Sequence, residues 1–225
     1  MIKRILIFLA ALFIFSACSI SGPASDITTT DKDTTNAQSQ GKADYARAYI
    51  DKINELEKES KLEYDLIYLN DDDIPELVAG ESWYYVSVYT YDSGELFLIM
   101  DNWGYGAMGN SGYDYIPKKN IIRNYDSDLA GMIVYESYFR VDENYEVQPY
   151  YDEILSTWMF KDINNNYTPD DEEYDENDPK SYFYFGDKEI TREEYESYVI
   201  QGNYELIIGK ESASEMIARL ESGKS

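Results

Sequence analysis

The chain has 225 residues, with 44 acidic side chains against 19 lysines and arginines, and its formal net charge at pH 7 is −25. Such a charge excludes attraction to nucleic acid, so we expect no nucleic-acid partner. The chain contains no histidine. This excludes Ser-His-Asp and Cys-His nucleophile systems and the usual zinc sites, and it leaves carboxylates, tyrosines, lysines and oxygen-ligated cations such as calcium.

The N-terminus has the pattern of a secretory signal peptide, which we place at residues 1–17. Lys3 and Arg4 precede an apolar run at 5–15, which is too short for the roughly 20 residues that span a bilayer core. The next residues, Ser16-Ala17-Cys18, resemble a bacterial lipobox. The resemblance implies that Cys18 receives a diacylglyceryl group. We therefore expect a protein anchored by lipid to the extracytoplasmic face of the bacterial cell membrane.

Residues 18–42 follow as the lipidated cysteine and a flexible linker, because Ser, Thr, Asp, Asn, Gln and Gly dominate them. A helix is predicted over about Asp44 to Glu59. Its apolar side chains recur every three or four residues, with Asp44 as N-cap and with a tyrosine stripe in the core. We expect residues 43–225 to form a single α+β extracellular domain.

From Leu62 to about Phe185 the sequence predicts short strands joined by tight turns. The expected strands span 62–68, 76–79, 83–91, 95–100, 113–116, 120–125, 132–141 and 145–147, with a further strand at 204–208. Asp92-Ser93-Gly94 has the composition of a hairpin turn. Such spacing favours an antiparallel meander in one sheet.

Two capping motifs predict helices near the C-terminus. Thr191 and Glu194 have the spacing of a capping box, and Ser212 and Glu215 repeat that spacing before a short amphipathic segment. The predicted fold class is therefore α+β, with an N-terminal helix, an antiparallel β meander and C-terminal helices.

Two acidic loops are candidate calcium sites. In the first, Asn70, Asp72 and Glu76 offer side-chain oxygens within a tight loop, whereas calcium needs about six to eight oxygens. Tyr68 replaces the expected first aspartate, and Asp73 replaces the glycine of a sharp turn. A calcium site and a plain acidic turn are both open interpretations.

The second loop spans 162–173 and matches the spacing of an EF-hand-like loop. Positions 1, 3, 5, 7, 9 and 12 of that pattern hold Asp162, Asn164, Asn166, Thr168, Asp170 and Glu173. Tyr167 occupies the position usually held by glycine, and acidic residues continue to Asp178. The open interpretations are a calcium site and a disordered acidic insert; no other cofactor is required.

The chain contains 24 tyrosines and three tryptophans, Trp83, Trp103 and Trp158. Aromatic faces beside acidic groups can stack on sugar rings, and the three tryptophans are our candidates for ligand stacking. The alternative is that these rings pack within strands. Glycosidase chemistry is the enzyme option that needs no histidine, since two carboxylates suffice. We assign no catalytic residue, because suitable carboxylate pairs occur by chance in so acidic a chain.

Two further segments extend the resemblance. The loop Asn70-Asp71-Asp72-Asp73-Ile74-Pro75-Glu76-Leu77 is similar to D-x-D-x-D-G-x-P-E-L loops, and residues 186–195 are similar to a G-x-K-E-I-T-x-E-E-Y element. With the lipobox-like start, they resemble uncharacterised surface lipoproteins of clostridia and related Gram-positive bacteria. The resemblance implies location and architecture and no catalytic residue.

We expect a non-enzymatic binding or sensing module at the cell surface, with an unknown ligand. The alternative is a carbohydrate-binding or carbohydrate-cleaving accessory protein.

Overall fold

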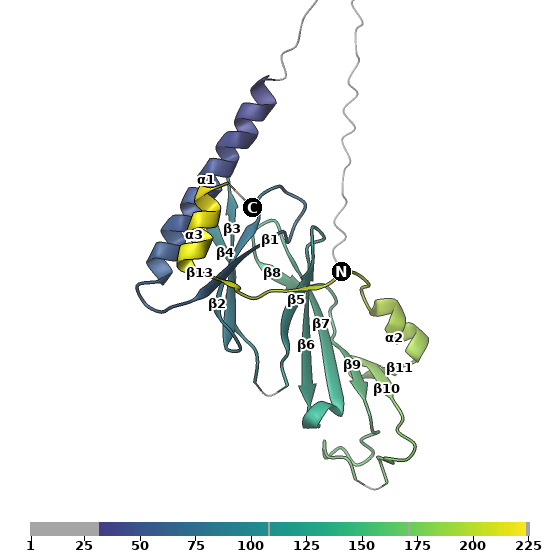
Figure 1. Ribbon diagram of the computed structural model, residues 1–225. Coiled ribbons are helices and arrows are strands. Elements are labelled where there is room, and N and C mark those ends of the chain that lie inside the picture. The colour runs from purple at the N-terminus through teal and green to yellow at the C-terminus, as the bar shows by residue number, and fades with distance from the viewer. Residues whose placement is uncertain (1–31, 108, 171, 224–225) are drawn as a thin grey trace, which may run out of the picture.

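Two antiparallel sheets, one long helix, two short helices and a 3₁₀ turn make up the structure (Figure 1). It is a computed structural model that describes residues 32–107, 109–170 and 172–223, with side chains from Asp44 onward. The α+β class predicted from the sequence is confirmed. The predicted signal peptide at 1–17, the anchor at Cys18 and the linker up to residue 31 lie outside the described residues.

The first sheet has the strand order β13-β1-β2-β3-β4. Its strands are β1 (Glu63–Ile67), β2 (Glu76–Glu81), β3 (Tyr85–Asp92), β4 (Glu95–Gly104) and β13 (Glu211–Ser212). Four of them form the predicted meander, and β13 returns from the C-terminal end of the chain to pair with β1.

The second sheet has the order β11-β10-β9-β7-β6-β5-β12, and β8 pairs with β7 outside this path. Its strands are β5 (Gly112–Ile116), β6 (Ile121–Asp128), β7 (Ile133–Val141), β8 (Val147–Pro149), β9 (Leu155–Trp158), β10 (Tyr182–Phe185), β11 (Lys188–Ile190) and β12 (Glu205–Leu206). A 3₁₀ turn, η1 (Leu129–Gly131), joins β6 to β7. Every pairing in this sheet is antiparallel.

The prediction of one sheet is wrong, because the meander breaks at the glycine-rich loop after β4. Within the described residues β5 pairs with β6 and β12, not with β4. Gly109 in this loop has φ +93°, and a Cβ there would lie 1.9 Å from the Ser127 carbonyl oxygen. Only glycine tolerates so close an approach, so the loop packs against β6 and starts a new sheet.

The two sheets share a hydrophobic core. Val88 and Met100 of the first sheet belong to the same buried cluster as Tyr115 and Ile122 of the second. Ile207, which follows β12, is buried in this cluster as well. Contacts between the sheets therefore come from residues far apart in the sequence.

The predicted hairpin turn after β3 is confirmed. Asp92 pairs with Glu95, so the loop has two residues, Ser93 and Gly94, with φ values of 51° and 94°. Two positive φ angles are what the favoured two-residue hairpin turn requires, and glycine meets that requirement without strain.

The N-terminal helix α1 (Lys32–Leu56) begins twelve residues before the predicted start. Asp44 therefore lies inside the helix and is not its N-cap, and the end at Leu56 precedes the predicted Glu59. Once the packed half has formed a helix, each added residue needs only propagation, which costs far less than nucleation. The predicted core stripe is confirmed, because Tyr45, Tyr49 and Ile53 are buried in one cluster.

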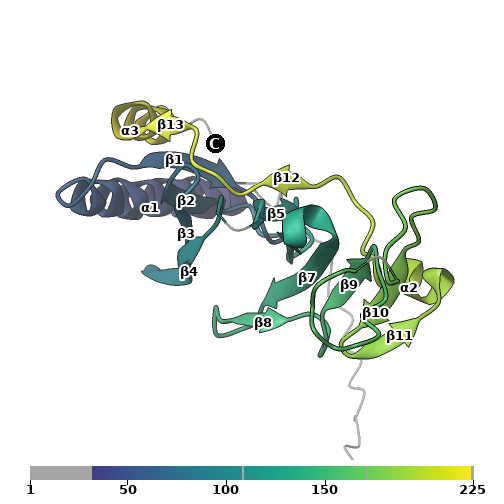
Figure 2. The same cartoon turned by 90° about the horizontal axis from the view of Figure 1, so that it is seen from below.

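The two helices near the C-terminus, α2 (Arg192–Tyr198) and α3 (Ala213–Glu221), begin at the predicted capping residues. The Thr191 amide donates to the Glu194 carboxylate, and the Glu194 amide donates to the Thr191 hydroxyl. Figure 2 shows α1 and α3 beside the first sheet and α2 beside the second.

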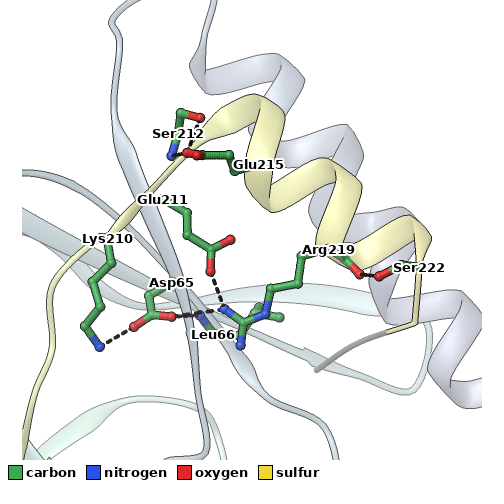
Figure 3. Close-up of polar contacts among 8 residues, drawn as sticks. All are labelled: Asp65, Leu66, Lys210, Glu211, Ser212, Glu215, Arg219 and Ser222. Atoms are coloured by element: carbon green, nitrogen blue, oxygen red, sulfur yellow. Dashed lines mark hydrogen bonds and ion pairs between the residues drawn. The ribbon is translucent and has the colours of Figure 1, made fainter.

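An ionic cluster holds the C-terminal segment against β1 (Figure 3). Asp65 is only 6% exposed and pairs with Lys210 at 2.6 Å and with Arg219 of α3 at 3.4 Å. Arg219 also pairs with Glu211 at 2.8 Å. These pairs bring α3 back to the first sheet after the chain has passed through the second.

No helix within the part of the chain that the structure describes is both long enough and apolar enough to cross a membrane.

Candidate functional site

A row of side chains across three strands forms the floor of the candidate site. Tyr135 of β7, Ser156 of β9 and Tyr184 of β10 lie opposite one another in the strand register. Side chains that are paired in this way point to the same face of a sheet. Because serine is small and stands between two tyrosines, the floor has a hollow at its centre.

Trp158 and Tyr167 form the aromatic wall. The Trp158 indole donates through Nε1 to the Ser156 hydroxyl at 3.1 Å, and its ring lies 5.5 Å from the Tyr184 ring. Tyr167 comes from the loop between β9 and β10, and its ring meets Trp158 edge-on at a centroid distance of 5.1 Å. Burial and a hydrogen bond with Tyr167 raise the pKa of the Tyr135 phenol, which therefore stays neutral.

These residues surround a pocket of about 530 Å³, whose rim is acidic. Glu153, Asp162 and Asp187 line it together with the aromatic rings, and the described lining residues include no lysine or arginine. The pocket therefore combines apolar ring faces with hydrogen-bond acceptors. A neutral, hydroxyl-rich ligand or a cation matches this chemistry, whereas an anion would be repelled.

The predicted calcium loop borders this pocket. Asp162 accepts hydrogen bonds from the amides of Asn166 and Tyr167 at 3.0 and 3.1 Å. The oxygen of Asn164 accepts from the Asn166 amide, and its amide group donates to Asp170 at 3.2 Å. The loop thus folds back on its own polar side chains.

Glu173 closes the loop. It is 8% exposed, and its Oε1 accepts from the amides of Ile163 and Asn164 at 2.6 and 3.2 Å. Its Oε2 is buried and has no hydrogen-bond partner within the described residues. Among those same residues, no three acidic side chains gather closely enough to form a metal-binding group by themselves.

In the first candidate loop, which holds Asn70, Asp72 and Glu76, the glutamate has a different role. Glu76 is fully buried, and its carboxylate accepts from the Leu69 amide at 2.7 Å and from the Thr90 hydroxyl at 3.4 Å. Burial raises its pKa to about 7. Asn70 and Asp72 each accept from a backbone amide two residues on. The carboxylate of Glu76 therefore serves the fold, and calcium at this loop stays a prediction.

The structure separates the three candidate tryptophans. Trp103 packs edge-on against Tyr113 and Phe139 at the core between the sheets. Trp83 is 70% exposed and lines a second hollow, of about 680 Å³, with Tyr84 and Tyr105. Of the three, only Trp158 stands beside the acidic loop.

Trp83 has φ 68°, which is unusual for a residue with a bulky side chain. Gly106 approaches Trp83 so closely that a Cβ on residue 106 would lie 2.5 Å from the carbonyl oxygen of Trp83. The strained turn presents Trp83 and Tyr84 to solvent as a second aromatic surface. Asp126 also lines that hollow.

Apart from Trp158 and Asp162, sequence patterns did not identify the residues of the Trp158 pocket as site residues. Tyr135 and Tyr184 are 49 positions apart and meet only through the register of β7, β9 and β10. Tyr167 was noted as a replacement for glycine, not as a ring that faces Trp158. One usable signal was the alternation of aromatic residues in the β10 segment, Tyr182-Phe183-Tyr184-Phe185.

No protein-family model, curated protein or solved structure matches the chain.

Proposed function

We propose that the protein is a lipid-anchored, non-enzymatic binding module on the extracytoplasmic face of the cell membrane, and that it binds its ligand in the Trp158 pocket. The observation that carries the choice of site is the combination of an aromatic wall and an acidic rim around one hollow. Polar groups that converge on a ring-lined pocket are typical of a binding site.

The anchor is proposed from the sequence at Cys18. Metabolic labelling with a fatty acid, followed by cell fractionation, tests it directly. The wild-type protein is expected to carry label and to sediment with membranes, and Cys18→Ser is expected to lose both properties. Equal labelling of Cys18→Ser would refute the anchor and leave the pocket proposal unaffected.

The same pocket supports a carbohydrate as ligand. Trp158 and Tyr167 present ring surfaces, while Glu153 and Asp187 offer acceptors for sugar hydroxyls. Stacking on a ring and hydrogen bonds to hydroxyls are complementary, because the face of a sugar is apolar and its edge is polar. The same acidic groups disfavour anionic glycans through charge repulsion.

Glycan-array binding with the full-length protein tests this proposal. We expect neutral or amino-substituted glycans to bind and anionic glycans to be absent from the hits. A hit that is then shortened on incubation would identify a carbohydrate-cleaving protein and would refute the non-enzymatic assignment. An array without hits would exclude a carbohydrate as the ligand.

A further inference from the structure

We propose that one calcium ion binds between the first half of the β9–β10 loop and Glu173, and that the bound ion holds Tyr167 against Trp158 at the ligand pocket. The proposed ligands are Asp162, Asn164, Asn166, Thr168, Asp170 and Glu173. The coupling to the pocket rests on the proposed function, whereas calcium binding stands on the loop alone.

The first argument is the buried carboxylate of Glu173. A carboxylate oxygen that is withdrawn from water and lacks a hydrogen-bond donor is costly to bury. The other oxygen of the same group bonds the amides of Ile163 and Asn164, the second and third residues of the loop. The carboxylate is thus held at the start of the loop through Oε1, and its Oε2 is buried without a hydrogen-bond partner within the described residues.

The second argument is the supply of oxygen ligands. Asp162, Asn164, Asn166 and Asp170 stand at alternate positions, and Glu173 occupies the position that binds calcium through both oxygens in loops of this spacing. The carbonyl oxygen of Thr168 completes the pattern. The three acidic members, Asp162, Asp170 and Glu173, do not gather into a metal-binding group within the described residues, so the ion must draw their side chains together.

Calcium binding requires one polar contact to rearrange. The Asn164 amide donates to Asp170 at 3.2 Å, and this hydrogen bond must give way for both side chains to turn their oxygens to an ion. The bonds from Asp162 to the amides of Asn166 and Tyr167 need not break, since each carboxylate oxygen has two lone pairs. The backbone turn at residues 162–167 can therefore persist when the ion binds.

The link to the pocket is Tyr167. Its amide bonds Asp162 and its ring packs on Trp158, so one residue belongs to both the loop and the aromatic wall. Its φ of 61° lies in the left-handed region, where a residue other than glycine persists only when its surroundings hold it. A calcium ion on Asp162 would reinforce this conformation and so fix the Tyr167 ring.

Isothermal titration of the full-length protein with calcium is the primary test, with magnesium at equal concentration as the control for nonspecific attraction to the negative charge. Magnesium demands a small octahedral site and keeps its waters, so a flexible loop of this kind favours calcium. We expect a one-to-one isotherm with Kd of about 10⁻⁴–10⁻³ M, the range of extracellular calcium modules. Equal responses to the two cations up to about 10 mM, well above that range, would overturn the proposal.

Glu173→Gln and Glu172→Gln form a matched pair, because each removes one negative charge and Glu172 is exposed. Glu173→Gln is expected to weaken calcium binding at least tenfold, and Glu172→Gln less than twofold. Equal weakening by the two changes would overturn the site. Circular dichroism of both variants checks folding, and Asp162→Asn repeats the test at the other end of the loop.

Tryptophan emission during the same titration reports on the coupling. We expect a calcium-dependent change that Trp158→Phe abolishes and Trp83→Phe leaves in place. Binding heat on titration with calcium, without this change in emission, would refute the coupling and leave the ion site supported. A normal calcium response with no ligand for the pocket would count against the proposed function alone.

Discussion

The ring of Tyr167 meets the indole of Trp158 edge-on, with 5.1 Å between the ring centroids. The contact joins an acidic loop to a three-strand floor, although the two rings belong to segments of different character. Aromatic pairs in this geometry contribute about 0.5–1.5 kcal/mol beyond the area they bury. The conformation of the loop and the shape of the pocket are therefore energetically linked.

Tyr167→Gly should separate ion binding from the pocket. Glycine adopts the positive φ of this position without strain, so calcium affinity is expected to stay the same or to rise. The loss of the ring removes the contact with Trp158, so the calcium-dependent change in tryptophan emission should disappear. Parallel calorimetric and fluorescence titrations measure the two effects.

Tyr145→Gly is the matched control, because Tyr145 also has a positive φ, 63°, and lies in a turn away from the pocket. It should change neither the calcium affinity nor the emission response. A loss of calcium binding in Tyr167→Gly would show that the ring is needed for the ion site itself. That result would contradict the proposal that the ion holds the ring in place.

Glu76 should make stability fall as the pH rises from about 4.5 to 7. Its pKa is raised by burial from 4.5 to about 7, so the folded state holds the proton more tightly than the unfolded state does. The contribution of Glu76 to stability is therefore fully present below its pKa in the unfolded state. That contribution is lost as the pH rises through its pKa in the folded state. The size of the effect is about 3 kcal/mol.

Glu76→Gln removes this titration. Its free energy of unfolding, relative to the wild type, is expected to increase by about 3 kcal/mol between about pH 4.5 and 7.5 in denaturant titrations. Glu81→Gln, at the exposed end of the same strand, is the control and should show no such trend. Parallel pH profiles for wild type and Glu76→Gln would contradict the assignment.

Asp65→Asn should loosen the C-terminal segment. It weakens the contacts with Lys210 and Arg219. We expect the free energy of unfolding to fall by about 1–3 kcal/mol, since Asp65 is buried but Lys210 is half exposed. Arg192→Gln breaks an exposed pair with Glu196 and should cost about 0.5 kcal/mol or less. Chemical denaturation compares them, and equal losses would show that the cluster in Figure 3 has no special role.

Local patterns predicted local structure well. The Ser93-Gly94 turn and the capping residues Thr191 and Ser212 were identified from the sequence, because each needs only a few neighbouring residues to form. The tyrosine stripe of α1 was assigned to the core on helical periodicity alone, and Tyr49 is fully buried.

Long-range pairing was beyond the same patterns. Nothing in the neighbourhood of Glu205 indicates that it pairs with Tyr115, or that Glu63 pairs with Ser212. The division into two sheets depends on these pairs and on the close approach of Gly109 to β6. A meander prediction assumes that each strand pairs with its neighbours in the chain, and the glycine loop breaks that assumption.

The candidate site was predicted in pieces. Trp158 and the loop at 162–173 are both identified from the sequence, and only three residues separate Trp158 from Asp162, but local patterns do not predict that the loop folds back onto the indole. The contact comes from Tyr167, which has a positive φ and whose ring packs on Trp158. Trp83 and Trp103 could not be distinguished from Trp158 without knowledge of burial.

The most direct test of the Trp158 pocket is ligand affinity in matched tryptophan variants, measured on full-length protein with the best glycan from the array. We expect Trp158→Ala to weaken binding at least tenfold and Trp83→Ala to leave it within twofold, with thermal unfolding confirming that both variants fold. Wild-type affinity in Trp158→Ala, or a loss confined to Trp83→Ala, would contradict the account and would move the site to the other aromatic surface.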